Sequence, residues 1–342
     1  MTSGDQAAAR QPPPRSLLPP GPHPPALPDA PGFDETYRWL VDGLPARLRQ
    51  PAERLPWTLG LTQSPDGRWS DFVRLHPNRQ LPLYAGQAPN GELAVTAVQL
   101  NHFLRAHHLG AFAWLVRDRI EDGQVEADDQ LLDLAEAFEQ RWREAIIEGT
   151  GDGLLADALF RRATARWERG THAERKVLAA GSVRAPIYAA IVREKLGWIG
   201  APSQALLQVT GDRRRVNAFL HAHDLYLVGL QVIDDVVDMD EDRALRGADF
   251  PSALHCSAGA LVRAAPKLVR LAAARAAGGG FTWFATWLEA FADAISAWRL
   301  AGDALNDELD SIGIAGEIED AIMRGADLPA ASVAAARAAT PV

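Results

Sequence analysis

Residues 128–148, DDQLLDLAEAFEQRWREAIIE, indicate the fold class most directly. The apolar residues of this stretch recur about every 3.6 residues, which is the period of an α-helix with one buried face. They are Leu131, Leu134, Ala135, Phe138, Trp142 and Ala145. The pattern therefore predicts an amphipathic helix and not a strand.

Segments of similar texture lie on both sides of this stretch and are separated by short breaks. Helices are predicted at 92–120, 154–181, 185–196, 203–239, 258–277 and 281–309. The breaks contain glycine or proline, as at 149–153, Gly211 and 278–280. Because strands do not alternate with helices and no repeat is visible, we predict an all-α fold built as a single large helical bundle.

The two ends of the chain differ from its middle in composition. Residues 1–32 hold 10 of the 23 prolines, which are incompatible with a helix interior, so this stretch is predicted to be a disordered tail. Prolines keep recurring to about residue 90, which predicts only short helices there, for example at 35–44. The alanine-rich residues 330–342 are predicted to be flexible, which leaves 33–329 as the helical domain.

The composition narrows the functional class. The 342 residues include 35 basic and 44 acidic side chains, for a net charge of −9, which argues against binding of nucleic acid through its phosphates. The single cysteine, Cys256, excludes a disulfide framework and a cysteine-based zinc site. No apolar run approaches the ~18 residues of a membrane span, and no secretory signal is visible. We therefore expect a cytoplasmic protein without a transmembrane segment.

An acidic cluster, VRDRIEDGQ at 116–124, closes one predicted helix. Asp118 and Asp122 are one turn apart on a helix and Glu121 lies beside them, while Gly123 suits the end of the helix. These carboxylates lie at the helix end that carries partial negative charge, so a cation is expected to offset them.

A second acidic cluster, LQVIDDVVDMDED at 230–242, closes another predicted helix. Asp234 and Asp238 are again one turn apart, with Asp235 about 100° around the helix. Mg²⁺ accepts one or two carboxylates together with phosphate oxygens, so a divalent metal could offset more of this charge than the nearby arginines. We expect the two clusters to face each other across one cavity. Helix ends balanced by nearby arginines are the alternative interpretation of either cluster alone.

The second cluster resembles the aspartate-rich motif of the class I isoprenoid synthase superfamily, above all that of the trans-prenyl diphosphate synthases. In that family a Gln precedes a DDxxD motif by three positions, as Gln231 precedes Asp234 here. The turn at 246–254 is loosely similar to the basic, glycine-containing turn that follows the motif, and the resemblance spans roughly residues 91–325.

The resemblance implies an isoprenoid synthase fold, a prenyl diphosphate substrate and bound Mg²⁺, with more than one ion in the site. The metal ligands it implies are Asp118, Glu121, Asp122, Asp234, Asp235 and Asp238. The residues it implies for diphosphate binding are Arg184, Lys195 and Arg246. The aspartates would be the catalytic residues, since their metal neutralises the leaving diphosphate.

The first cluster departs from the pattern of chain-elongating synthases. Residues 118–122 read DRIED in place of DDxxD, no arginine pair follows, and 86–91 contain no basic residue. Elongation needs those groups to hold a second diphosphate. The departures therefore favour a prenyltransferase-like terpene synthase, which ionises an allylic diphosphate and gives a cyclic or rearranged terpene.

Two other interpretations stay open. The chain could be a trans-prenyltransferase, of the polyprenyl or squalene/phytoene synthase type, or a non-catalytic, synthase-like helical partner protein. It could also form a homodimer.

Two further patterns are interpreted as structural: a histidine pair as core or polar rim, and an aromatic stripe as core. His107 and His108 are adjacent and point about 100° apart on a helix, so they make a poor chelate. The aromatic stripe near the C-terminus is more typical of a core than of a carbocation pocket; it comprises Phe284, Trp287, Phe291 and Trp298.

Overall fold

A computed structural model describes residues 30–211, 213–296 and 305–325 of the chain, without the side chains of 305–309. Over these residues the regular elements are helices, which confirms the all-α class. Extended backbone pairs in this part of the chain at an isolated bridge between Gln87 and Leu93. The tails predicted at 1–32 and 330–342 lie outside the described residues, apart from 30–32.

The chain divides into two compact units, which are described separately. The N-terminal unit contains the described residues up to Ala163 together with 198–216. The C-terminal unit contains 164–197 and the described residues from Asn217 onward. The expectation of one continuous bundle stays a prediction.

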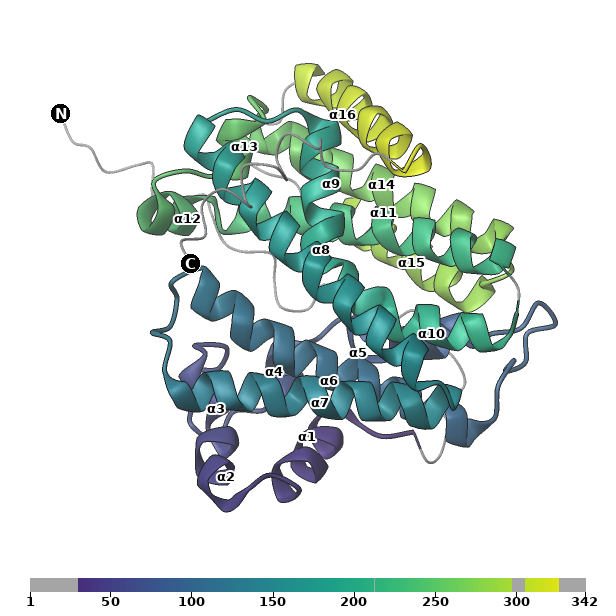
Figure 1. Cartoon of the computed structure of the whole chain (residues 1–342). Helices are drawn as coiled ribbons and strands as arrows, with labels where there is room; N and C mark the ends of the chain where they lie inside the picture. The colour runs from purple at the N-terminus through teal and green to yellow at the C-terminus, as the bar shows by residue number, and fades with distance from the viewer. Residues whose placement is uncertain (1–29, 212, 297–304, 326–342) are drawn as a thin grey trace. The chain divides into compact units, whose positions relative to one another are not determined.

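The N-terminal unit begins with short helices and continues with long ones (Figure 1). Its elements are α1 (Phe33–Asp42), α2 (Ala46–Glu53), α3 (Leu55–Thr58), α4 (Trp69–Phe72), α5 (His76–Ala85), α6 (Ala97–Glu121), α7 (Asp129–Thr150), the first part of α8 (Gly153–Ala180), most of the 3₁₀ helix η1 (Gly197–Gly200), α10 (Ala201–Val209) and the first residues of α11 (Arg213–Val237). The short helices up to residue 90 agree with the recurring prolines, two of which, Pro51 and Pro82, lie inside α2 and α5.

Helix α6 is the centre of the N-terminal unit. Helices α1, α5, α7 and α10 all pack against it, and its middle turns are buried on every side. Gly110 allows a close approach, since a Cβ there would lie 3.1 Å from Nε1 of Trp142. Trp114 stacks on Trp198 with ring centroids 5.4 Å apart. This aromatic packing is the core of the unit.

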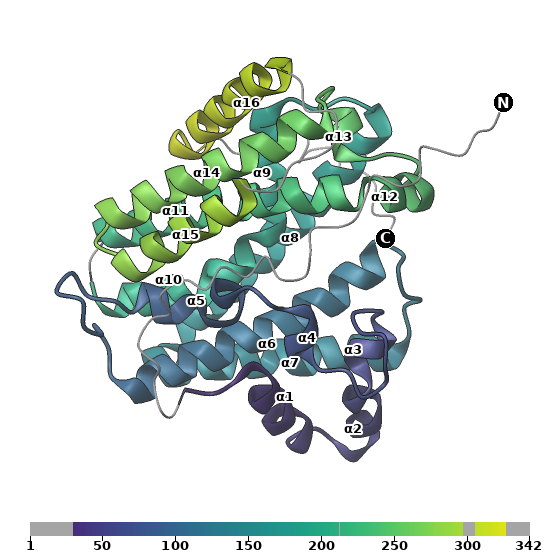
Figure 2. The same ribbon diagram turned by 180° about the vertical axis from the view of Figure 1, so that it is seen from behind.

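The C-terminal unit combines long helices with the short helices α12 and α13 (Figure 2). Its elements are the rest of α8, α9 (Ala185–Leu196), α11 from Asn217, α12 (Met239–Arg246), α13 (Phe250–Ala253), α14 (Ala258–Gly278), α15 (Thr282–Ser296) and α16 (Leu305–Met323). Helix α14 packs against α15 and α16, and α16 also packs against α9.

The aromatic stripe of α15 forms core, as predicted. Phe284 lies against Phe219 of α11, while Trp287 and Phe291 contact the ring of Tyr226. Trp298, the last member of the predicted stripe, lies outside the described residues.

Most helix boundaries follow the predicted breaks, including the one at Gly211, whereas α12, α13 and the part of α16 after residue 309 were not predicted as helices. The segment predicted at 203–239 is α10 and α11, which Gly211 separates with a left-handed φ of 77° that glycine adopts without strain. Helix α9 has the predicted bounds, whereas residues 297–304 of the segment predicted at 281–309 lie outside the described part.

Candidate functional site

The second acidic cluster occupies the last turn of α11 and the start of α12. The side chains of Asp234 and Asp238 are exposed, whereas Asp235 is buried. The amide of Asp238 donates to the carbonyl of Asp234 at 2.8 Å, so the turn that separates them is helical. The structure therefore presents two of the three predicted aspartates to solvent and turns the third inward.

Asp235 accepts hydrogen bonds on both of its carboxylate oxygens. Tyr188 of α9 donates from Oη to Oδ2 at 2.6 Å, and Gln231 donates from Nε2 to Oδ1 at 2.8 Å. Burial raises the pKa of Asp235 to about 8, although both hydrogen bonds favour the ionised form and so oppose the rise. Burial and the nearby charge of Asp235 raise the pKa of Tyr188 as well, so the phenol keeps its proton and donates.

Two of the predicted diphosphate-binding residues meet at one carboxylate. Lys195 of α9 forms an ion pair from Nζ to Oε2 of Glu174 at 2.8 Å, and Arg246 of α12 forms one from Nη1 to Oε1 at 3.3 Å. Glu174 lies on α8, and its side chain is 8 % exposed. Arg246 also pairs with Asp242, at 3.3 Å. The structure thus brings Lys195 and Arg246 together, with an internal anion between them.

The third predicted cation, Arg184, is the N-cap residue of α9. Its side chain is exposed, and its carbonyl accepts the amide of Tyr188 at 3.0 Å. The backbone thus places Arg184 one turn from the tyrosine that holds Asp235.

The first acidic cluster ends α6, as predicted. Asp122 is the C-cap residue and Gly123 follows with a φ of 70°, which lets the chain leave the helix. Asp118, Glu121 and Asp122 are half-buried. This cluster belongs to the N-terminal unit, so its expected position opposite the second cluster stays a prediction.

Arginines offset part of the charge near both clusters. Arg117 pairs with Glu139 of α7, and Arg243 pairs with Asp249 from Nη2 to Oδ2 at 2.9 Å. Hydrogen bonds from Ser252 and Arg243 together hold the pKa of Asp249 below its usual value, against the effect of burial. The ion pair between Arg243 and Asp249 therefore supports the alternative interpretation of the second cluster, in which nearby arginines balance an acidic helix end.

The fit to Mg²⁺ rests on the exposed pair of carboxylates. Asp234 and Asp238 are exposed oxygen donors one turn apart, and Mg²⁺ is commonly held by one or two carboxylates with water and phosphate oxygens in its other positions. Among the described residues, no three His, Cys, Asp or Glu side chains are placed to hold one ion. Protein side chains there do not form a closed metal cage.

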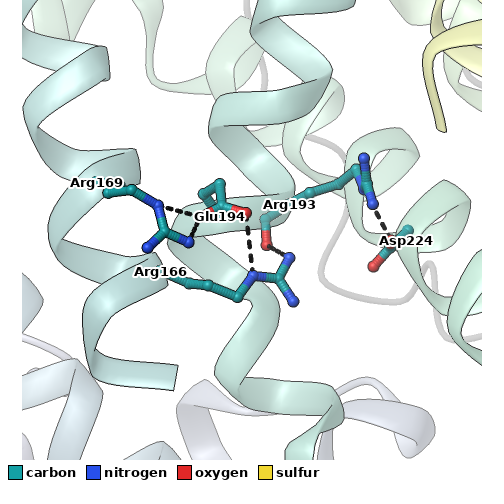
Figure 3. A network of polar contacts seen from close by, with 5 residues as sticks. All are labelled: Arg166, Arg169, Arg193, Glu194 and Asp224. Atoms are coloured by element: carbon teal, nitrogen blue, oxygen red, sulfur yellow. Dashed lines mark hydrogen bonds and ion pairs between the residues drawn. The ribbon is translucent and has the colours of Figure 1, made fainter. Parts of the chain in front are cut away.

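A polar network that the sequence did not predict connects α8, α9 and α11 (Figure 3). Arg166 and Arg169 of α8 both donate to Glu194 of α9, at 3.2 and 2.5 Å, and Arg193 donates to Asp224 of α11 at 2.8 Å. The local sequence feature related to this network is Gly170 in α8. A Cβ on Gly170 would lie 2.5 Å from the backbone nitrogen of Lys195, so α8 and α9 approach closely there.

The adjacent histidines are core, as predicted. His107 is 1 % exposed and His108 is fully buried, and their Nε2 atoms contact the carbonyls of Asn78 and Arg79 at 2.9 and 2.7 Å. Nδ1 of His108 lies 2.9 Å from the hydroxyl of Thr36. Both rings are occupied in tying α1 and α5 to α6, so they do not form a metal site.

No helix in the described part of the chain is both long and apolar enough to cross a membrane.

Comparison of the chain with protein-family models, with curated proteins and with solved structures finds no match. The resemblance to the isoprenoid synthases therefore rests on the sequence motif.

Proposed function

We propose that the chain is a Mg²⁺-dependent isoprenoid enzyme that ionises an allylic prenyl diphosphate, releases diphosphate and forms a cyclic or rearranged terpene. The observation that carries the proposal is the end of α11, where Asp234 and Asp238 are exposed one turn apart while the chain between them is helical. Two exposed carboxylates at this spacing suit a metal ion that is shared with a phosphate ligand.

The chain's own residues would divide the work of binding the substrate. Asp234 and Asp238 would hold the metal, which when bound neutralises the charge that develops on the leaving diphosphate. Lys195 and Arg246 would supply fixed positive charge, and a diphosphate would compete with Glu174 for both of them. Arg184 adds an exposed cation at the first turn of α9.

The first cluster would contribute ligands of its own. Asp118, Glu121 and Asp122 are half-buried at the end of α6, and we propose that they hold further Mg²⁺ in the loaded enzyme.

Cyclisation is favoured over elongation because a second diphosphate has no evident counter-charge. Residues 86–91 and 123–140 contain no lysine or arginine. Burying a diphosphate beside carboxylates without cations is strongly unfavourable.

The test uses the full-length chain with Mg²⁺ and geranyl, farnesyl or geranylgeranyl diphosphate, each with and without isopentenyl diphosphate. We expect inorganic diphosphate to be released without isopentenyl diphosphate, and the product to keep the carbon number of its substrate. Asp234→Asn should abolish most of the release, whereas Glu241→Gln, an exposed acid just beyond the motif, should not. Strict dependence on isopentenyl diphosphate, with longer prenyl products, would instead identify a prenyltransferase.

A non-catalytic helical protein is the second candidate. The observation that favours it is Glu174, which already neutralises Lys195 and Arg246 inside the protein. Absence of diphosphate release from a folded chain under every condition above would support this candidate and contradict the first.

A further inference from the structure

The hydrogen bond between Tyr188 and Asp235 joins two helices where the acidic motif lies. It connects residues 47 positions apart, from Oη to Oδ2 at 2.6 Å, and both partners are buried, at 1 % and 6 % exposure. Gln231, one turn earlier on α11, donates from Nε2 to the other carboxylate oxygen of Asp235, Oδ1, at 2.8 Å. A buried carboxylate with donors on both oxygens is held in one orientation, because leaving either oxygen unpaired is costly.

The tyrosine ring is itself fixed from a third helix. The ring of Phe250 in α13 meets it edge-on, with centroids 4.9 Å apart and an interplanar angle of 71°. Just before α9, the amide of Val183 donates to the carbonyl of Ala253 at 2.8 Å. The hydroxyl of Tyr188 therefore approaches Asp235 from a rigid position between α9 and α13.

Anchoring Asp235 also determines where its neighbours point. Successive residues on a helix are about 100° apart, so a carboxylate held inward at 235 turns the side chain at 234 away from the interior. Asp238 follows the last residue of α11 as the N-cap of α12, so the position of that last turn decides where Asp238 lies. Both Asp234 and Asp238 are exposed.

We infer that Tyr188 is a positioning residue that, through Asp235, fixes the last turn of α11 and so presents Asp234 and Asp238 to a divalent cation. In this scheme Asp235 is an internal anchor, although the family resemblance implies that it is a metal ligand. The inference deepens the proposed function and rests on it only for the cation, because the anchoring itself is a property of the folded chain.

The first measurement is amide hydrogen exchange over residues 235–238 of the full-length chain without metal. Tyr188→Phe keeps the ring and its contact with Phe250 but removes the donor, and we expect exchange there to rise about tenfold. The control is Tyr37→Phe, which removes an equally short buried hydrogen bond, 2.6 Å to the carbonyl of Ala52, in the N-terminal unit. It should leave exchange at 235–238 unchanged.

The second measurement is Mn²⁺ affinity by electron paramagnetic resonance, with Mn²⁺ standing in for Mg²⁺ at carboxylate ligands. Tyr188→Phe should weaken binding about tenfold, the lower end of the range for residues that orient metal ligands. Asp235→Asn keeps an oxygen that accepts from Tyr188, and the Gln231 amide can turn over so that its oxygen accepts from the new NH2 group. This variant should therefore retain both the exchange pattern and the Mn²⁺ affinity. Asp234→Asn should weaken Mn²⁺ binding without changing exchange.

The outcomes separate this inference from the proposed function. Exchange at 235–238 that is the same in Tyr188→Phe as in the unaltered chain overturns the inference. Loss of Mn²⁺ affinity in Asp235→Asn with unchanged exchange also overturns it, since that result makes Asp235 a ligand. An unaltered chain that binds no Mn²⁺ contradicts the proposed function, while raised exchange in Tyr188→Phe would still support the anchoring role.

Discussion

Replacement of Glu174 by glutamine probes the internal anion on which two predicted diphosphate ligands converge. The carboxylate lies 2.8 Å from Nζ of Lys195 and 3.3 Å from Nη1 of Arg246. Glutamine has nearly the same shape, so Glu174→Gln removes the charge without opening a cavity. Two cations then remain in a largely buried place.

The expected loss of stability follows from the burial of the three side chains. Removing one partner of a buried ion pair costs about 3–5 kcal/mol, because the remaining charge is left uncompensated. The side chain of Lys195 is 14 % exposed, so its share of the cost is close to that limit. Arg246 is 25 % exposed and keeps Asp242 at 3.3 Å, so solvent and that carboxylate reduce its share. We expect a loss of about 3 kcal/mol, or about 4 °C in thermal midpoint for a chain of this size.

The assay is thermal and urea unfolding of Glu174→Gln beside the unaltered chain. The matched control is Glu168→Gln, the same substitution at an exposed position of the same helix, which should change stability by less than about 0.5 kcal/mol. Adding Lys195→Met to Glu174→Gln removes one of the two buried cations and should recover at least about 1 kcal/mol. Inorganic diphosphate should raise the midpoint of Glu174→Gln more than that of the unaltered chain, since the freed cations bind it.

A Glu174→Gln variant as stable as Glu168→Gln would refute the reasoning. It would mean that the ion pairs of Lys195 and Arg246 add nothing beyond what solvent provides.

Three further expectations concern separate parts of the molecule. Asp234→Asn removes one of several like charges, so without metal its thermal midpoint should equal or exceed that of the unaltered chain; a fall of several degrees would make Asp234 a structural residue. Burial lowers the pKa values of His107 and His108 from 6.5 to about 4 and about 3, so at pH 5 the unfolded chain binds protons that the folded chain does not. Asp235, whose pKa burial raises to about 8, has the opposite effect, because the folded chain binds a proton there that the unfolded chain does not. In an Asp235→Asn background the free energy of unfolding should therefore fall as pH drops from 6.5 towards 4, by a few kcal/mol, and equal urea midpoints at pH 7 and pH 5 would contradict this. Gly170→Ala places a Cβ 2.5 Å from the backbone nitrogen of Lys195 and should destabilise the contact between α8 and α9 by about 1–3 kcal/mol, measured by urea unfolding.

Sequence alone predicted the helices because the signals that start and stop a helix act within a turn or two. Pro186 lies in the first turn of α9 and Gly197 follows its last residue, so the bounds of that helix are local information. Gly211 separates α10 from α11 for the same reason. The burial of His107 and His108 also followed from sequence, because they lie within an apolar run.

The roles inside the acidic motif were decided by tertiary structure. The pattern placed Asp234, Asp235 and Asp238 on one helix, and nothing in it distinguished an exposed carboxylate from an anchored one. That difference depends on Tyr188, which lies 47 residues before Asp235 and reaches it only when α9 packs on α11.

The partner of the predicted diphosphate ligands was equally hidden from sequence. Glu174 lies 72 residues before Arg246, in a helix whose pattern gave it no special place. Helix periodicity reports which face of a segment is buried, since burial depends on the average character of that face. The pairing of one charged atom with another depends on the packing of several helices to within a few ångströms, and only the folded chain specifies that packing.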